Sequence, residues 1–230
     1  MKLFNRTLSF VNELSLRLKR NRRIKFDNSN IKINLGCGLT VEKGWQNIDG
    51  SLSSVVSSLP KFAKKIAYHL TGAKNSFTID EYIKILSENC FIHHDLRTGI
   101  PMDDGVSEYV FSSHFLEHLY PGDAQVLLKD SYRVLKKGGR LRLSIPDLEF
   151  AIGLYPENKE RMLKNYFFIN NASNNFSNHK YMYDYDMIRS ILANIGFQNI
   201  LKSSYKASDF PDVERLDNRG EDSLFIEAIK

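Results

Sequence analysis

The chain has 230 residues, 42% of them hydrophobic, which is enough for one sizeable domain, and its two cysteines exclude a disulfide framework. Because no apolar run approaches the roughly 20 residues that span a bilayer and no signal-peptide pattern begins the chain, we expect a cytoplasmic protein. The net charge of +5 comes from residues 1–25, which alone carry +7. The rest of the chain lacks the basic stripe of a nucleic-acid enzyme, so we expect no nucleic-acid partner.

Residues 1–30 are predicted to form a basic amphipathic helix followed by a linker. Apolar residues recur there at helical spacing, at Phe4, Leu8, Val11, Leu14 and Leu18. Such a helix rests on an anionic membrane surface, packs on the body of the protein or forms a disordered arm. The first alternative predicts peripheral contact with the inner face of the membrane through residues 1–25.

From residue 31 onward, short apolar runs alternate with helical patterns. Strands are predicted at 31–35, 46–49, 91–94, 108–112, 140–145, 197–201 and 224–229. Helical patterns cover 123–137, closed by Gly138-Gly139 as a C-cap, and 187–193; a short helix is expected at 114–120. A helical insertion at about 51–90 forms either a lid or substrate wall or a surface insertion. The alternation predicts a mostly parallel α/β sheet, which binds ligands at the carboxyl ends of its strands.

The strand ends therefore supply the candidate site. Gly36-Cys37-Gly38 follows the first strand, where glycines let the backbone turn tightly and approach a ligand. Asp49 ends the second strand and can accept hydrogen bonds from both hydroxyls of a ribose. Asp95 follows the third and can accept from the amine of an adenine. A turn or cap explains each residue singly, but their order predicts a pocket for an adenosine with a charged, non-phosphate tail.

Longer runs carry a family resemblance. The segments NLGCG, GWQNID, HDLRTGIPMDDGVSEYVFSSHFLEHL and LLKDSYRVLKKGGRLRLSIPDL resemble class I S-adenosylmethionine-dependent methyltransferases, and 179–230 resembles their C-terminal part. Within that class the chain is similar to small bacterial enzymes associated with cell-surface polysaccharide biosynthesis. The resemblance implies a Rossmann-like fold whose seven-stranded, mostly parallel sheet ends in an antiparallel hairpin. It also implies S-adenosyl-L-methionine as cofactor and O-methylation of a saccharide, such as a glycan precursor, or another small-molecule hydroxyl.

The resemblance also assigns roles to residues. Cofactor-binding positions are Gly36, Cys37, Gly38, Asp49, Asp95, Leu96 and Ser113. His114 is the first candidate for a general base, since histidine has a suitable pKa, although it could instead cap its short helix. Asp147, just past the fifth strand, is the second catalytic candidate or orients the acceptor. In one departure from the family, Asn34 and Leu35 stand where many members have an acid.

The sequence also suggests alternative interpretations. The run from His114 to His118 matches His-x-x-Glu-His, a zinc-protease pattern that needs a helix and a third ligand, so we assign no metal site. A nicotinamide oxidoreductase would need a third glycine where Val41 stands. A non-catalytic adenosylmethionine-binding module is a further alternative. His179, Tyr181 and Tyr183 either face the acceptor or pack in the core.

Overall fold

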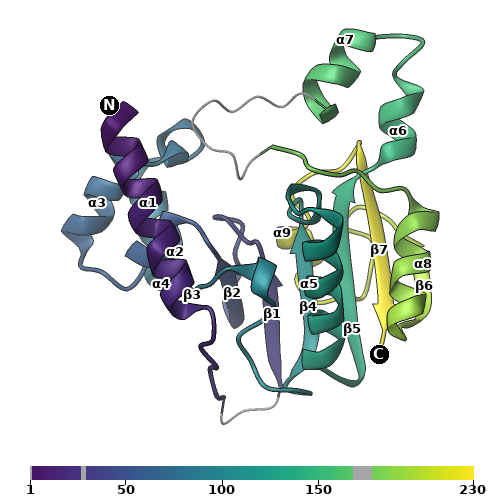
Figure 1. Ribbon diagram of the computed structural model, residues 1–230, viewed down its shortest axis with the longest axis horizontal. Coiled ribbons are helices and arrows are strands. Elements are labelled where there is room, and N and C mark those ends of the chain that lie inside the picture. The colour runs from purple at the N-terminus through teal and green to yellow at the C-terminus, as the bar shows by residue number, and fades with distance from the viewer. Residues whose placement is uncertain (1, 27–29, 168–177) are drawn as a thin grey trace.

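The computed structural model describes residues 2–26, 30–167 and 178–230, with side chains from residue 10 onward (Figure 1). Its centre is a seven-stranded sheet in the order β3-β2-β1-β4-β5-β7-β6. The strands are β1 Ile31–Leu35, β2 Trp45–Asp49, β3 Cys90–His93, β4 Ser107–Ser113, β5 Leu135–Pro146, β6 Gln198–Ser203 and β7 Ser223–Ile229. Strands β1 to β5 pair in parallel, and β7 runs antiparallel to both neighbours. This confirms the predicted mostly parallel sheet with its C-terminal antiparallel hairpin.

Helices cover the sheet and its edges. They are α1 Lys2–Lys19, α2 Leu52–Val56, α3 Lys61–Leu70, α4 Ile79–Glu88, α5 Pro121–Val134, α6 Leu148–Gly153, α7 Lys159–Met162, α8 Tyr185–Ile195 and α9 Val213–Leu216. Local sequence sets several ends: Thr78 and Glu81 form a capping box on α4, Asp184 caps α8, and Gly196 ends α8 at a φ of 118°. Figure 1 shows α6 and α7 beyond the carboxyl ends of the parallel strands.

The main core lies between the sheet and α5 and α8. It contains fully buried residues from the central strands, such as Ile33, Val110, Leu141 and Ile226. A separate aromatic cluster joins Trp45 and Phe111 to Phe210, and α9 adds to it. A third cluster lies within residues 51–90, where α3 and α4 pack on each other and against Leu39 and Phe91. The sheet is therefore covered on both faces, which leaves the carboxyl edge for the site.

Helix α1 docks on the body of the protein. Leu16 is buried, Nδ2 of Asn12 donates to the carbonyl of Gly50 at 2.9 Å, and Nζ of Lys19 lies 3.0 Å from Nδ1 of His93. The side chains of Phe4 and Leu8, part of the predicted stripe, lie outside the described residues. Within the described part of the chain, no helix is long and apolar enough to cross a membrane.

Two local predictions are wrong. The helix expected to run to Lys137 ends at Val134, and β5 continues through Gly138 and Gly139, whose backbone exchanges hydrogen bonds with Lys230. Long-range pairing with the C-terminal strand thus overrides the local helix signal. The short helix expected at 114–120 is only a 3-10 turn, Leu116–His118, because His114 adopts a left-handed φ of 49°.

Candidate functional site

The turn after β1 brings two of the predicted residues together. Gly36 and Gly38 have φ values of 62° and 51°, in the left-handed region that favours glycine. The N–H of Gly36 donates to the carbonyl of Ile48, and the N–H of Gly38 donates to Oδ2 of Asp49, each at 2.9 Å. Oδ1 of Asp49 accepts from the N–H of Ser51 at 2.6 Å. The carboxylate that ends β2 is thereby fixed beside the glycine turn.

Asn34 stabilises the glycine turn, at a position where many members of the resembled family have an acid. It is 1% exposed, and its Nδ2 donates to Oδ1 of Asn47 at 3.0 Å and to the carbonyl of Thr40 at 2.9 Å. An amide can donate these two bonds, whereas a carboxylate can only accept. The side chain therefore ties the glycine turn to β1 and β2, and residues 36–44 form turns without a helix.

The two glycines differ in what surrounds them. A Cβ on Gly36 would lie 2.1 Å from the ring of Phe115, whereas a Cβ on Gly38 would meet no described atom within 4 Å. Position 36 must therefore lack a side chain so that the turn after β4 can pack against it. Gly38 instead borders open space beside the fixed carboxylate of Asp49. Such a cradle, open over backbone and flanked by an acceptor, fits a ribose and its attached chain.

Substituting the two glycines should separate folding from cofactor binding. Gly36→Ala combines left-handed strain of about 1–2 kcal/mol with a clash, and we expect thermal unfolding to show the larger destabilisation. Gly38→Ala should unfold at a temperature closer to that of the wild type, yet bind S-adenosylhomocysteine more weakly in calorimetric titration, because its methyl group enters the open cradle. Unchanged affinity in a folded Gly38→Ala variant would place the cofactor elsewhere.

Three further residues predicted to bind the cofactor are paired or buried within the protein, namely Asp95, Leu96 and Cys37. Asp95 accepts from Nε and Nη2 of Arg97 at 2.9 and 2.8 Å; burial acts to raise its pKa, but Arg97 more than offsets this and holds the pKa low. Leu96 is buried in the main core, and Cys37 is 6% exposed, so burial raises the pKa of its thiol. The adenine-binding role of Asp95 and Leu96 stays a prediction.

Asn218 is a site residue that sequence reasoning missed. Oγ of Ser113 donates to its Oδ1 at 3.1 Å, and its Nδ2 donates to Oγ1 of Thr40 at 2.9 Å. Asn218 therefore links the end of β4 to the glycine turn. Its side chain comes from a loop 105 residues beyond Ser113, and no local motif marks it.

His114 lies in a buried polar cluster at the end of β4. Its side chain is 6% exposed, Nε2 lies 2.9 Å from Oγ of Ser223, and Nδ1 lies 3.4 Å from Oε1 of Glu117. Glu117 is 1% exposed; burial acts to raise its pKa, but the neighbouring His114 and His118 more than offset this and keep the pKa low. The ionised carboxylate therefore lies behind the imidazole of His114, on the side opposite Ser223.

Asp147 and the predicted acceptor-facing aromatics follow β5. Oδ1 of Asp147 accepts from the N–H of Glu149 at 2.9 Å and so caps α6, while Oδ2 lies 3.9 Å from Nζ of Lys202. Tyr183 is 2% exposed and burial raises its pKa to about 12, so its phenol stays protonated. Tyr181 is 40% exposed, which leaves it the more accessible of the two rings.

Comparison with known proteins gives one family match. Residues 54–143 match the family described as "Methyltransferase domain". The match begins after the glycine turn and Asp49, so the assignment of those residues depends on their place in the fold. No curated protein matches the sequence.

Solved structures share the fold at low identity. PigF with SAH is 14% identical with a TM-score of 0.50, over 87% of this chain and 56% of that one. The methyltransferase SibL in its apo form is also 14% identical with a TM-score of 0.50, over 96% of this chain and 55% of that one. A SAM-dependent methyltransferase from Archaeoglobus fulgidus is 15% identical with a TM-score of 0.48, over 95% and 94%.

The fold and the domain match select among the alternatives. The antiparallel β7 lies between β5 and β6, whereas the Rossmann fold of dinucleotide-binding proteins has the order 3-2-1-4-5-6, without an inserted antiparallel strand. This disfavours the nicotinamide oxidoreductase, and the domain match favours a catalyst over a binding module. The chain therefore has a Rossmann-like methyltransferase fold, and the domain match at residues 54–143 indicates a methyltransferase that uses S-adenosylmethionine.

Proposed function

We propose that the protein transfers the methyl group to a hydroxyl of a small molecule, and that this acceptor is a saccharide such as a glycan precursor. The observation that carries the proposal is the position of His114. Its neighbour Phe115 packs against Gly36 of the glycine turn, and the imidazole of His114 itself is backed by Glu117. From this we infer that His114 serves an acceptor bound next to the cradle. A hydroxyl is a poor nucleophile near neutral pH and gains from a histidine base.

The proposal gives each candidate residue a role. S-adenosylmethionine supplies a methyl group on a sulfonium, so the protein must chiefly place the acceptor in line with it. Gly38 and Asp49 would hold the ribose and its chain, and Asp95 would hold the adenine. His114 takes the proton of the hydroxyl through Nε2, once the acceptor replaces Ser223 as its neighbour. Asp147 orients the acceptor through Oδ2.

A panel of acceptors tests the substrate class. Purified protein is incubated with S-adenosylmethionine and, separately, nucleotide sugars, free saccharides, small amines, transfer RNA and protein, and release of S-adenosylhomocysteine is measured. We expect release with saccharides, and a new O-methyl ether by mass spectrometry. Turnover with amines or transfer RNA alone would refute the hydroxyl acceptor without affecting the assignment as a methyltransferase.

Cofactor affinity should depend on Asp49. Asp49→Asn removes the charge that we assign to the ribose hydroxyls, and we expect S-adenosylhomocysteine to bind roughly 10–100-fold more weakly, with NAD bound weakly or not at all by either protein. Calorimetric titration measures both ligands. Asp103→Asn, which alters an exposed carboxylate, serves as the control. Equal affinity of the Asp49 and Asp103 variants would remove Asp49 from the cofactor site.

We also propose that α1 contacts an anionic membrane surface. Its face opposite Leu16 exposes Phe10 by 67%, Leu14 by 48% and Leu18 by 81%, and the adjoining residues 17–25 are rich in Arg and Lys. α3, on the same side of the molecule in Figure 1, exposes Phe62 by 67%. Apolar side chains among cations favour the interface of a bilayer that contains acidic lipids.

Flotation with vesicles tests the membrane contact. The wild type should float with vesicles containing phosphatidylserine and much less with pure phosphatidylcholine. Phe10→Ser/Leu14→Ser/Leu18→Ser should stay at the bottom, because it removes three exposed apolar side chains of α1 but keeps the docked Leu16. Ile152→Ser, which removes a 56% exposed apolar side chain on α6, should float like the wild type. Equal flotation of wild type and triple variant would contradict the proposal.

A further inference from the structure

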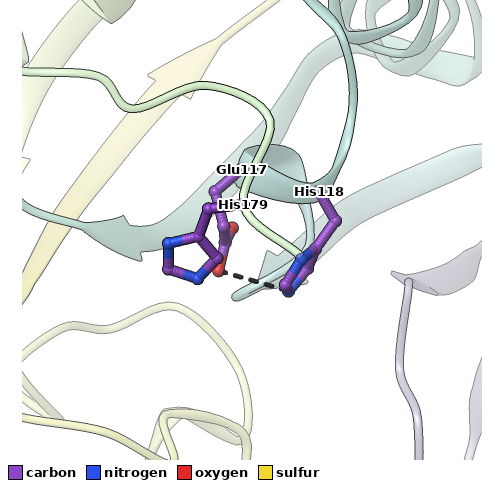
Figure 2. A group of neighbouring side chains, drawn as sticks. All are labelled: Glu117, His118 and His179. Carbon is purple, nitrogen blue, oxygen red and sulfur yellow. Dashed lines mark ion pairs between the residues drawn. The ribbon is translucent and has the colours of Figure 1, made fainter. Parts of the chain in front are cut away.

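Three potential metal ligands converge beside the candidate active site. Glu117 and His118 come from the 3-10 turn after β4, and His179 comes from the segment before α8 (Figure 2). One ligand atom from each residue lies within 4.8 Å of the other two. Figure 2 shows the carboxylate of Glu117 between the two imidazoles. The sequence pattern suggested a different pair, His114 and His118 on one helix, but here there is no α-helix and His179 completes the group.

Hydrogen bonds fix which nitrogen of each histidine is available. Nδ1 of His118 lies 3.3 Å from the carbonyl oxygen of Asn178, and Nδ1 of His179 lies 3.0 Å from the carbonyl oxygen of Tyr166. A carbonyl only accepts, so each Nδ1 carries the proton and each Nε2 keeps its lone pair. Metal-binding histidines are commonly oriented in this way, by a bond from the other nitrogen to a backbone carbonyl.

The buried carboxylate of Glu117 has two histidine neighbours but no hydrogen bond within the described residues. The residue is 1% exposed, and neither Oε1 nor Oε2 has a hydrogen bond within the described part of the chain. Nε2 of His118 lies 3.8 Å from Oε1, and Nδ1 of His114 lies 3.4 Å from it, but neither contact has hydrogen-bond geometry. An unsatisfied buried carboxylate is costly, whereas a bound cation would compensate its charge.

We propose that Glu117, His118 and His179 form a binding site for a divalent transition-metal ion of the Zn²⁺ class. Two imidazoles and one carboxylate are a ligand set that zinc accepts, with a further position open for water or substrate. With bonds of about 2.0–2.1 Å, a tetrahedral ion holds its ligand atoms roughly 3.3 Å apart, so the group needs to close by no more than about 1.5 Å. His118 and His179 are partly exposed, which gives the ion a path from solvent.

Titration of the tag-free full-length protein with Zn²⁺ and Co²⁺ tests the site directly and needs neither cofactor nor acceptor. We expect one Zn²⁺ per chain and an increase in the melting temperature of about 5–10 °C at a hundredfold excess over Kd. Co²⁺ should give the visible absorption of a four- or five-coordinate complex with nitrogen and oxygen ligands. His118→Asn and His179→Asn should each weaken binding by about 100-fold or more.

His69→Asn is the matched control, because this histidine is exposed on α3 and lies outside the group. It should bind Zn²⁺ like the wild type. Loss of affinity in the His69 variant, or no loss in folded His118 and His179 variants, would mean adventitious binding and overturn the proposal. So would absence of stoichiometric binding to the wild type. None of these results depends on the identity of the methyl acceptor, so the site and the proposed function can fail separately.

Discussion

His114→Asn should lower turnover by about 10²–10⁴-fold on the hydroxyl acceptor while the affinity for S-adenosylhomocysteine changes little. Asparagine tolerates the left-handed backbone at this position, where φ is 49°, so the variant removes the imidazole with the least strain. The side chain of residue 114 makes contacts with Ser223 and Glu117, and neither contact reaches the glycine turn. Single-turnover kinetics with saturating cofactor measures the rate, and calorimetric titration measures affinity.

Two comparisons separate a base from a structural histidine. Ser223→Ala removes the hydroxyl beside Nε2 but keeps the imidazole, so it should retain most of the rate if the acceptor replaces Ser223 during catalysis. His114→Asn should unfold within a few degrees of the wild type. Normal turnover of His114→Asn would refute the base, and lost cofactor binding would make His114 part of the cofactor pocket.

The sheet was predictable because its signals are local. Apolar runs that end at Gly36, Asp49 and Asp95 correspond to β1, β2 and β3, and the alternation at 140–145 lies within β5. Periodicity and glycine position depend on a few neighbouring residues. The predicted proximity of Gly38 and Asp49 also holds, since parallel neighbours end at the same edge.

The rest of the site could not be predicted because its partners come from distant parts of the chain. Asn218 reaches Ser113 and Ser223 reaches His114 over separations of 105 and 109 residues. His179 joins Glu117 only because the segment before α8 returns to the end of β4, where the N–H of Lys180 donates to the carbonyl of Glu117. A single sequence records no such pairing.

Arg142 is a core residue whose partners also come from distant parts of the chain. Its substitution has the largest expected effect on stability. The residue is fully buried; Nη2 and Nε donate to Asp217 at 2.5 and 3.1 Å, and Nη1 donates to Glu227 at 2.5 Å. Arg142→Met keeps the length of the side chain but leaves the buried carboxylate of Asp217 without a cation, while Glu227 keeps only its pairing with Arg140. We expect a loss of about 3–5 kcal/mol in the free energy of unfolding, measured by urea denaturation, and a melting temperature lower by roughly 6–20 °C.

Arg215→Met is the matched control, because Arg215 also pairs with a carboxylate, Glu42, at 2.6 Å but is 68% exposed. Exposed pairs contribute about 0–1 kcal/mol, so this variant should remain close to the wild type. Arg142→Met/Asp217→Asn should recover part of the loss, since it removes one uncompensated charge. Similar stabilities for the Arg142 and Arg215 variants would contradict the argument. Because Asp217 precedes Asn218, which links Ser113 to Thr40, the folded fraction of Arg142→Met should also bind the cofactor more weakly.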